Sequence, residues 1–191
     1  MSKICVFCGS SMGVDDIYSK KAIELADYFI ENGHTLVYGG ANVGLMKVIA
    51  DRMLEAGKEV IGVMPQHLVD KEVAHHGISK LHVVESMAKR KDLLIEISDS
   101  FIAMPGGFGT LDELFEAMTL IQTHKIEKFP IILVGTKFWE GLLDWVKTTL
   151  LESFGNISAK DLDLIHLVDT EDEVVGILDS FYNGSELSPN F

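Results

Sequence analysis

The stretch that most constrains this chain is a buried strand followed by a proline, a glycine-rich turn and a helix. Residues 101–104 are all apolar, and they run into the sequence PGGFG at 105–109. Apolar residues then recur at helical spacing, which predicts a helix that begins near Thr110. The first N–H groups of a helix have no partner within it, and the helix dipole favours negative charge there. The stretch is therefore typical of a phosphate-binding turn.

Glu113 lies one turn into that helix, and the sequence supports two interpretations of it. The carboxylate can face a ligand that is held at the glycine turn. Alternatively, Thr110 and Glu113 have the spacing of a capping box, in which the glutamate only bonds its own helix start. The spacing alone leaves both interpretations open.

The rest of the chain alternates between strand and helix. We predict strands at 4–8, 35–38, 59–64, 81–84, 131–134 and 167–168, and helices at 18–32, 45–56, 87–97, 111–123, 138–154 and 170–182. This alternation indicates a parallel sheet with right-handed crossovers. The prediction is an α/β fold with a Rossmann-like, doubly wound parallel sheet flanked by helices.

Two further loops follow strands and belong to the same edge of the sheet. Gly9-Ser10-Ser11 follows the first strand, and Gly39-Gly40 opens a glycine turn after the second. Ligands of open α/β sheets bind at the carboxyl edge, where the strand order reverses. Neither loop reproduces the G-x-G-x-x-G fingerprint, so the sequence favours a mononucleotide over NAD.

Arg90 lies in the middle of an apolar stripe on the predicted helix at 87–97. Met87, Leu94 and Ile97 share its face. Such a charge needs a partner, because an unpaired buried charge is costly. The partner is either an acidic neighbour or an anionic ligand, and we favour the ligand because arginine suits phosphate and carboxylate groups. Lys91 lies beside it and can serve the same anion.

Composition and charge limit the classes of function. The chain has 191 residues, of which 47% are hydrophobic and 24% charged, as expected for a globular α/β domain. We assign residues 1–183 to one domain and 184–191 to a loose C-terminal tail. The net charge of -13 argues against a nucleic-acid partner. We expect no signal peptide and no membrane span, and hence a cytoplasmic protein.

Cysteine and histidine give no sign of a redox centre or metal. Cys5 and Cys8 share a predicted strand and should point to opposite faces as buried thiols. The polar connection at 66–80 contains Glu72, His75 and His76 without the regular spacing of metal ligands. We therefore expect no metal, and we interpret this connection as a mobile loop near the site.

Four ordered motifs together resemble the LOG ("Lonely Guy") family. They are CGSS at 8–11, YGG at 38–40 with GLM at 44–46, the Arg90-Lys91 pair, and PGGFGTLDE at 105–113. The last matches the family signature P-G-G-x-G-T-x-x-E, and the resemblance extends over residues 3–182. Members are often labelled "possible lysine decarboxylase", but we find no lysine placed for a pyridoxal phosphate Schiff base with an acidic partner for the ring nitrogen.

The resemblance implies a Rossmann-like phosphoribohydrolase. Such enzymes hydrolyse the N-glycosidic bond of a nucleoside 5′-monophosphate and release the free base and ribose 5-phosphate. Plant and microbial members act on cytokinin nucleotides, and some bacterial relatives act on AMP. The reaction requires no cofactor and no metal, and the usual assembly is a homodimer with the site close to the subunit contact.

The resemblance also implies roles for individual residues. It places Arg90 and Glu113 at the two catalytic positions. The remaining substrate-binding positions are Gly106, Gly107, Phe108, Gly109 and Thr110 for the phosphate loop, Glu72, Lys91 and Thr119 along the substrate, and Ser10, Ser11, Gly39 and Gly40 for the rest of the pocket. Two positions depart from the family pattern, since Ala88 replaces a frequent histidine and Lys47 a frequent glycine.

Two other classes of protein remain open at this stage. A nucleotide or molybdenum-cofactor carrier without turnover would use a related fold, and fold alone does not separate binding from catalysis. A structural scaffold would leave a buried arginine and two glycine turns unexplained. Arg90 and Glu113 together favour the enzyme, in which we expect the helix N-terminus to keep the Glu113 carboxylate ionised.

Overall fold

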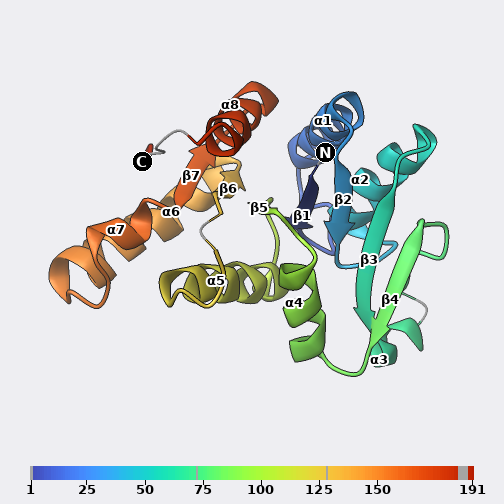
Figure 1. The fold of residues 1–191 in the computed structure, drawn as a ribbon, viewed down its shortest axis with the longest axis horizontal. Helices are drawn as coiled ribbons and strands as arrows, with labels where there is room; N and C mark the ends of the chain where they lie inside the picture. Colours follow the sequence, from blue (N-terminus) through green and yellow to red (C-terminus); the bar gives the residue numbers. More distant parts are fainter. Residues whose placement is uncertain (1, 72, 128, 185–188) are drawn as a thin grey trace.

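The computed structural model describes residues 2–71, 73–127, 129–184 and 189–191 (Figure 1). Within these residues, seven strands form one sheet in the order β4-β3-β2-β1-β5-β6-β7, and all the pairs are parallel. The strands are β1 (Lys3–Phe7), β2 (Thr35–Tyr38), β3 (Val60–Pro65), β4 (Lys80–Val84), β5 (Ser100–Ala103), β6 (Ile131–Val134) and β7 (Ile165–Val168). The order runs outward from β1 in both directions. The predicted doubly wound sheet is therefore confirmed, and its switch point lies between β1 and β5.

Helices cover both faces of the sheet. They are α1 (Ile17–Asn32), α2 (Gly44–Glu55), α3 (Gln66–Val69), α4 (Met87–Glu96), α5 (Phe108–Gln122), α6 (Thr136–Trp145), α7 (Ala159–Leu162) and α8 (Glu171–Tyr182), and α6 continues into the π-helical segment η1 (Val146–Ser153). Apolar side chains of α1, α2 and α8 pack on one face of the sheet, and those of α4, α5 and α6 pack on the other. Figure 1 shows α4 and α5 below the switch point, where ion pairs join them.

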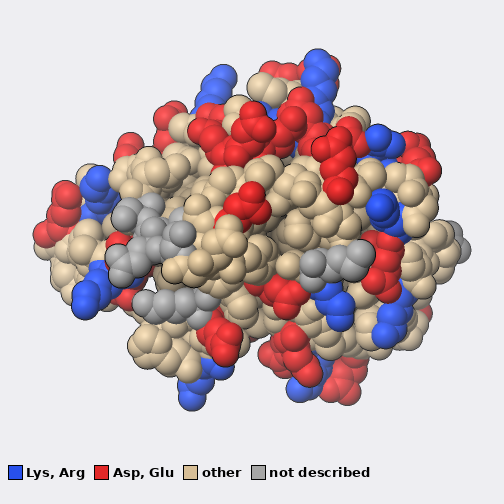
Figure 2. All heavy atoms as spheres, turned by 45° about the horizontal axis from the view of Figure 1, so that its top comes forward, with Lys and Arg blue, Asp and Glu red and all other residues tan. Residues whose placement is uncertain are grey.

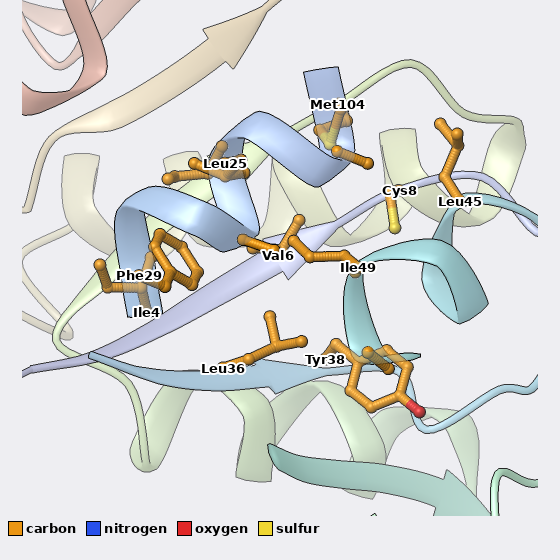
Figure 3. Close-up of a cluster of buried hydrophobic side chains, with 14 of the residues drawn as sticks. Ile4, Val6, Cys8, Leu25, Phe29, Leu36, Tyr38, Leu45, Ile49 and Met104 are labelled. Carbon is orange, nitrogen blue, oxygen red and sulfur yellow. The ribbon is translucent and has the colours of Figure 1, made fainter. Parts of the chain in front are cut away.

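The core between the sheet and α1 is shown in Figure 3. Ile4 and Val6 of β1 point toward α1 and α2, and Phe29 of α1 packs among the same side chains. Side chains alternate across a strand, so Cys5 belongs to the core on the opposite face while Cys8 belongs to this one. Both thiols are free and buried, which confirms the prediction for them.

The structure departs from the predicted helices in its second half. The helix predicted at 138–154 begins at Thr136 and changes at Val146 to π-helical hydrogen bonding. The sequence does not predict the short helices α3 and α7, because four residues carry too little periodicity to be recognised. Two predicted helix starts are confirmed, since the hydroxyls of Ser86 and Thr170 cap α4 and α8.

The connection between β3 and β4 is more ordered than the predicted mobile loop. It contains α3, and Ala74 forms an isolated antiparallel bridge with Ala41. His75 in the same segment is buried and lies 2.9 Å from Asp51 of α2. Hydrogen bonds to residues distant in the sequence therefore order a segment whose local composition is typical of a loop.

The C-terminal residues that the structure describes are held against β7. The Asn190 side-chain oxygen accepts a hydrogen bond from the Leu167 N–H at 2.8 Å, and its amide donates to the Leu167 carbonyl at 2.7 Å. Phe191 packs on the core beneath. The expectation of a loose tail is therefore wrong for residues 189–191, because an asparagine amide pairs with the outer strand as a strand residue would.

Acidic side chains dominate one side of the surface. In Figure 2 they gather over the upper part of the view, while lysine and arginine lie mainly toward its margins.

Burial raises the pKa of Glu171 at the start of α8, and repulsion by Glu24 and Asp172 raises it further. In the described part of the chain, no helix has the length and apolar character that a membrane span requires.

Candidate active site

Three loops meet at the carboxyl edge of the sheet, at the switch point between β1 and β5. The Gly9 N–H donates to the Pro105 carbonyl at 3.0 Å, and the Leu45 N–H donates to the Gly9 carbonyl at 3.1 Å. Gly44 has a φ of +58°, and a Cβ at this position would lie only 2.3 Å from the Ser10 carbonyl carbon. The loops after β1 and β5 and the start of α2 therefore form one interlocked unit that needs glycine at 44.

A cavity of about 490 Å³ opens beside this unit, within the size range of small-molecule sites. Four residues predicted from the sequence line it: Ser10, Ser11, Gly106 and Gly107. The structure therefore brings the loop after β1 and the glycine turn after β5 to the same cavity, although Ser11 and Gly106 are 95 positions apart in the sequence.

The aromatic wall of this cavity is not predicted from the sequence. Tyr18 and Phe138 both line the cavity, and their ring centroids lie 6.5 Å apart in an edge-on arrangement. Each ring belongs to the first turn of a helix that follows a strand of the sheet, α1 for Tyr18 and α6 for Phe138. An aromatic residue at that position is the signal that could have identified them, because the first turn of such a helix lies at the carboxyl edge.

The helix after the PGG turn begins earlier than predicted. Helix α5 starts at Phe108 with Gly107 as its N-cap, and no side chain caps it. Thr110 is therefore inside the helix rather than at its cap, and the predicted alternative of a capping box with Glu113 is wrong. The side chain of Phe108 is 91% exposed, so it contributes nothing to the core.

The glycines of this turn have different structural requirements. A Cβ on Gly106 would lie 2.0 Å from Oγ1 of Thr110, so close packing requires glycine there. A Cβ on Gly107 or Gly109 would meet no atom of the described residues within 4 Å. Packing within this chain therefore explains Gly106 but not the other two glycines, which leave open space beside the unpaired N–H groups of the helix start.

Arg90 and Glu113 form a buried ion pair between α4 and α5. Nη1 of Arg90 lies 2.8 Å from Oε1 of Glu113, and both side chains are buried. Nε of Arg90 donates to the Val63 carbonyl at 3.0 Å. The acidic-neighbour interpretation of Arg90 is thus realised in the structure. A Cβ on Gly39 would lie 2.0 Å from Nη2 of Arg90, so the guanidinium is also the reason for glycine at that position.

Burial raises the pKa of the Glu113 carboxyl above its ordinary value, and the Arg90 guanidinium opposes that rise. The carboxyl groups of Asp112 and Glu116 add to the rise, whereas Lys91 also opposes it. The expectation that the helix N-terminus holds this carboxylate in its ionised form therefore omits the dominant effect, which is loss of water around the carboxyl group. A carboxylate with a raised pKa is a stronger base, which suits proton transfer.

Lys91 is held away from this pair by two other carboxylates. Its Nζ lies 2.9 Å from Oδ2 of Asp112 and 2.5 Å from Oε2 of Glu116. Burial lowers the pKa of Lys91, but the hydrogen bonds that Lys91 donates to these two carboxylates outweigh burial and raise the pKa overall. The lysine therefore flanks the Arg90–Glu113 pair as a second, more exposed charge cluster on the same two helices.

Two further predicted residues, Thr119 and Gly40, are not among the described residues that line the cavity beside the Gly9 and Gly106 loops. The Thr119 hydroxyl donates to the Phe115 carbonyl at 2.7 Å, and Thr119 lines a separate cavity of about 140 Å³ beside η1 and α7. Gly40, with a φ of +78°, accepts a hydrogen bond from the His75 N–H at 2.9 Å. Glu72 lies outside the described residues. Lys47 pairs with Asp51 one turn along α2.

The described residues contain no group of three or more His, Cys, Asp or Glu side chains that could hold a metal ion. The described part of the site offers three groups that can take part in chemistry. These are a buried carboxyl with a raised pKa, a guanidinium bonded to it, and a helix N-terminus with open space at its glycines.

Comparison with known sequences identifies a family. A family model described as "Possible lysine decarboxylase" matches residues 46–178. The chain is 37% identical over 153 residues to "Cytokinin riboside 5'-monophosphate phosphoribohydrolase LOG" of Oryza sativa subsp. japonica, a match that covers 80% of this chain and 63% of that protein. It is 38% identical over 152 residues to the "Cytokinin riboside 5'-monophosphate phosphoribohydrolase" of Rhodococcoides fascians, covering 79% of this chain and 77% of that protein. The matched region thus spans less than two thirds of the rice protein but about three quarters of the bacterial one.

Comparison with solved structures supports the fold. The molybdenum cofactor binding protein of Rippkaea orientalis superposes with a TM-score of 0.71 over 95% of this chain and 97% of that chain, at 20% sequence identity. Identity at this level shows a shared fold and no more. The match of the family model and the identity to relatives over most of the chain go further, and together they show that this chain belongs to the LOG family, the one described as "Possible lysine decarboxylase".

Proposed function

We propose that this protein is a phosphoribohydrolase that hydrolyses the N-glycosidic bond of a purine nucleoside 5′-monophosphate. The substrate is AMP or a cytokinin riboside monophosphate, and the products are the free base and ribose 5-phosphate. The observation that carries the proposal is the buried Arg90–Glu113 pair, one helical turn from the glycine loop that opens α5. The names of the rice and Rhodococcoides fascians relatives support the same reaction.

In this proposal the 5′-phosphate binds at the start of α5. The N–H groups of the first helical turn have no partner within the helix and favour an anion. Gly107 and Gly109 leave the space that a phosphate needs, because no described atom would contact a Cβ at either position. Gly106 and Thr110 pack on each other and shape the turn, while Ser10 and Ser11 face the adjoining cavity.

Glu113 and Arg90 supply the chemistry. Cleavage of the bond between the ribose and the base builds positive charge on the ribose, as in other glycoside hydrolyses. The Glu113 carboxylate stabilises that charge and accepts a proton from the attacking water. The water oxygen bonds to the ribose carbon. The base leaves with the electron pair of the broken bond and takes up a proton. Arg90 fixes the carboxylate through the contact of 2.8 Å. General-base catalysis of this kind contributes about 10²- to 10⁴-fold to the rate.

The resemblance to the family also supports a proposal about assembly and location. We propose a homodimer in the cytoplasm, with no nucleic-acid partner, as expected for an acidic chain that binds a small nucleotide. Large apolar side chains are exposed around the cavity beside the Gly9 and Gly106 loops, among them Met12, Val14 and Phe138. Such groups favour a surface that is covered by a ligand or by a second subunit.

The test is release of base from a panel of nucleoside 5′-monophosphates. Purified protein is incubated with AMP, a cytokinin riboside monophosphate and pyrimidine nucleotides, and chromatography measures free base while an enzymatic assay measures ribose 5-phosphate. We expect equal amounts of both products from at least one purine nucleotide. Intact nucleotide throughout the panel would contradict the proposal.

The alternative function is a nucleotide or molybdenum-cofactor carrier without turnover. The likeness to the Rippkaea orientalis protein concerns the fold alone and does not favour this alternative. Calorimetry separates the two functions. Tight binding of a nucleotide that remains intact after long incubation would replace the hydrolase by the carrier.

A further inference from the structure

His75 is a buried histidine that takes no part in the reaction described above. Its Nε2 lies 2.9 Å from Oδ1 of Asp51 in α2, and the Gly77 N–H donates to its Nδ1 at 3.2 Å. Because Nδ1 accepts a hydrogen bond, Nε2 carries the ring proton and donates it to the aspartate. A single tautomer of the imidazole therefore joins α2 to the connection between β3 and β4.

The backbone of this connection pairs with the glycine turn that follows β2. The His75 N–H donates to the Gly40 carbonyl at 2.9 Å, and the Asn42 N–H donates to the Val73 carbonyl at 2.8 Å. These two bonds flank the isolated antiparallel bridge between Ala41 and Ala74. An isolated pair of short strands is marginally stable in water. The bridge therefore depends on an anchor, and the hydrogen bond from His75 to Asp51 supplies one.

The turn that this bridge holds is the turn that packs on Arg90. Gly39 precedes Gly40, and a Cβ at Gly39 would lie 2.0 Å from Nη2 and 3.3 Å from Cζ of Arg90. The guanidinium thus lies directly against the backbone of the turn, while its other nitrogens bond Val63 and Glu113. A shift of the turn by a few tenths of an ångström would change the wall against which Arg90 is placed.

Asp51 is itself held in position. Burial pushes the pKa of Asp51 upward, but hydrogen bonds from His75 and Lys47 outweigh burial, and the net pKa lies below the ordinary value. Lys47 forms an ion pair with Asp51 within α2. Lys47, the lysine that departs from the family pattern, therefore holds Asp51 in place for its hydrogen bond with His75 and does not face the cavity.

We propose that His75 is a positioning residue: anchored to Asp51, it holds the Gly39–Gly40 turn against Arg90 and thereby fixes the Arg90–Glu113 pair for the chemical step. The kinetic part of this inference rests on the proposed hydrolase function, whereas the structural part does not. The bonds of His75 lie on the Arg90 side of the site and not at the phosphate loop. Loss of the anchor should therefore lower kcat and leave KM nearly unchanged.

The test compares His75→Asn with wild type. Asparagine can still accept the hydrogen bond from the N–H two residues on, as in an Asx turn, but it cannot reach Asp51. We expect kcat to fall on the order of 10- to 100-fold, as for a small misplacement of catalytic groups, with KM changed by less than about threefold. Hydrogen exchange at the amides of Asn42 and residue 75 should become faster, while amides of α1 keep their protection. His76→Asn changes the exposed neighbour and should match wild type.

A double-mutant cycle completes the test. Asp51→Ala should reproduce the loss in kcat, and the double variant with His75→Asn and Asp51→Ala should lose no more kcat than either single variant. Asp51→Asn keeps an acceptor for the histidine and should retain most of kcat. Three results would overturn the inference. The first is a His75→Asn variant with the kcat and the amide exchange rates of wild type. The second is losses in kcat that add in the double variant, and the third is a loss in kcat that only follows the folded fraction measured by circular dichroism. If the wild-type protein hydrolyses no nucleotide, the proposed function fails, and hydrogen exchange in the ligand-free protein still decides whether the anchor exists.

Discussion

The buried pair of Arg90 and Glu113 can be dissected by a double-mutant cycle of stability. Arg90→Met leaves the Glu113 carboxyl group buried without the guanidinium that pairs with it. Glu113→Leu leaves the Arg90 guanidinium buried without its carboxylate. Removing one partner of a buried ion pair costs about 3–5 kcal/mol of unfolding free energy. Apolar replacement of both partners is often neutral or stabilising by about 1–4 kcal/mol. Here the Val63 carbonyl also loses its partner, at a cost of about 1–3 kcal/mol. We therefore expect the double variant within about 2 kcal/mol of wild type and each single variant well below it.

The pH dependence of the single variant provides an internal check. In Arg90→Met only burial and neighbouring charges act on Glu113, so its pKa in the folded state is raised above the unfolded value of about 4.3. A raised folded pKa gives stability that is complete below the unfolded pKa and is lost as the pH rises through the folded pKa. The deficit of Arg90→Met relative to the double variant should therefore be small near pH 4.3, roughly the unfolded pKa, and grow toward neutral pH.

Equilibrium unfolding in urea measures these free energies. Tryptophan fluorescence and circular dichroism should give coincident transitions if unfolding is two-state, and the comparison is repeated at several pH values. Single losses below about 1 kcal/mol that simply add in the double variant would show that water screens the two charges. That result would refute the description of the pair as a buried and coupled unit.

Other predictions concern the wall around Arg90, the carboxyl group and a distant helix cap. Gly39→Ala inserts a Cβ 2.0 Å from Nη2 of Arg90. Measured by base release, kcat should fall on the order of 10- to 100-fold with little change in KM. An unchanged kcat would show that Arg90 moves aside without an effect on the reaction. The rate of base release should fall as the pH drops through the raised pKa of Glu113, because the ionised carboxylate acts as the base, and a limb at or below about pH 4.3 would contradict this role. Thr170→Ala removes the cap of α8 and should cost about 0.5–2 kcal/mol in thermal unfolding while kcat stays unchanged, and an unaltered melting temperature would argue against the capping box.

The strands and the loops at their carboxyl ends could be predicted because they depend on local sequence. Short apolar runs identify β1, β2 and β5, and a glycine turn begins within three residues of the end of each strand. The need of Arg90 for a partner could be predicted from its place in an apolar stripe. Its choice of Glu113 could not, because that choice depends on how α4 and α5 pack.

The residues that the sequence does not reveal are those whose role comes from packing between distant segments. Tyr18 and Phe138 meet across the cavity although α1 and α6 are far apart in the sequence. His75 belongs to a stretch whose composition is typical of a loop, and only the contact with Asp51 distinguishes it. The hydrogen bond between Asn190 and Leu167 of β7 likewise depends on the fold, and no local sequence pattern predicts it.

The most direct test of the account is single-turnover release of adenine from AMP by Glu113→Gln. Glutamine keeps the size of the side chain and removes the base, and Glu24→Gln on the exposed side of α1 is the matched control. If Glu113 is the catalytic carboxylate, Glu113→Gln should bind AMP in calorimetry and release adenine about 10²-fold or more slowly than wild type, with Glu24→Gln unaffected. Release of adenine by Glu113→Gln at the wild-type rate would contradict the assignment of this carboxylate to the reaction.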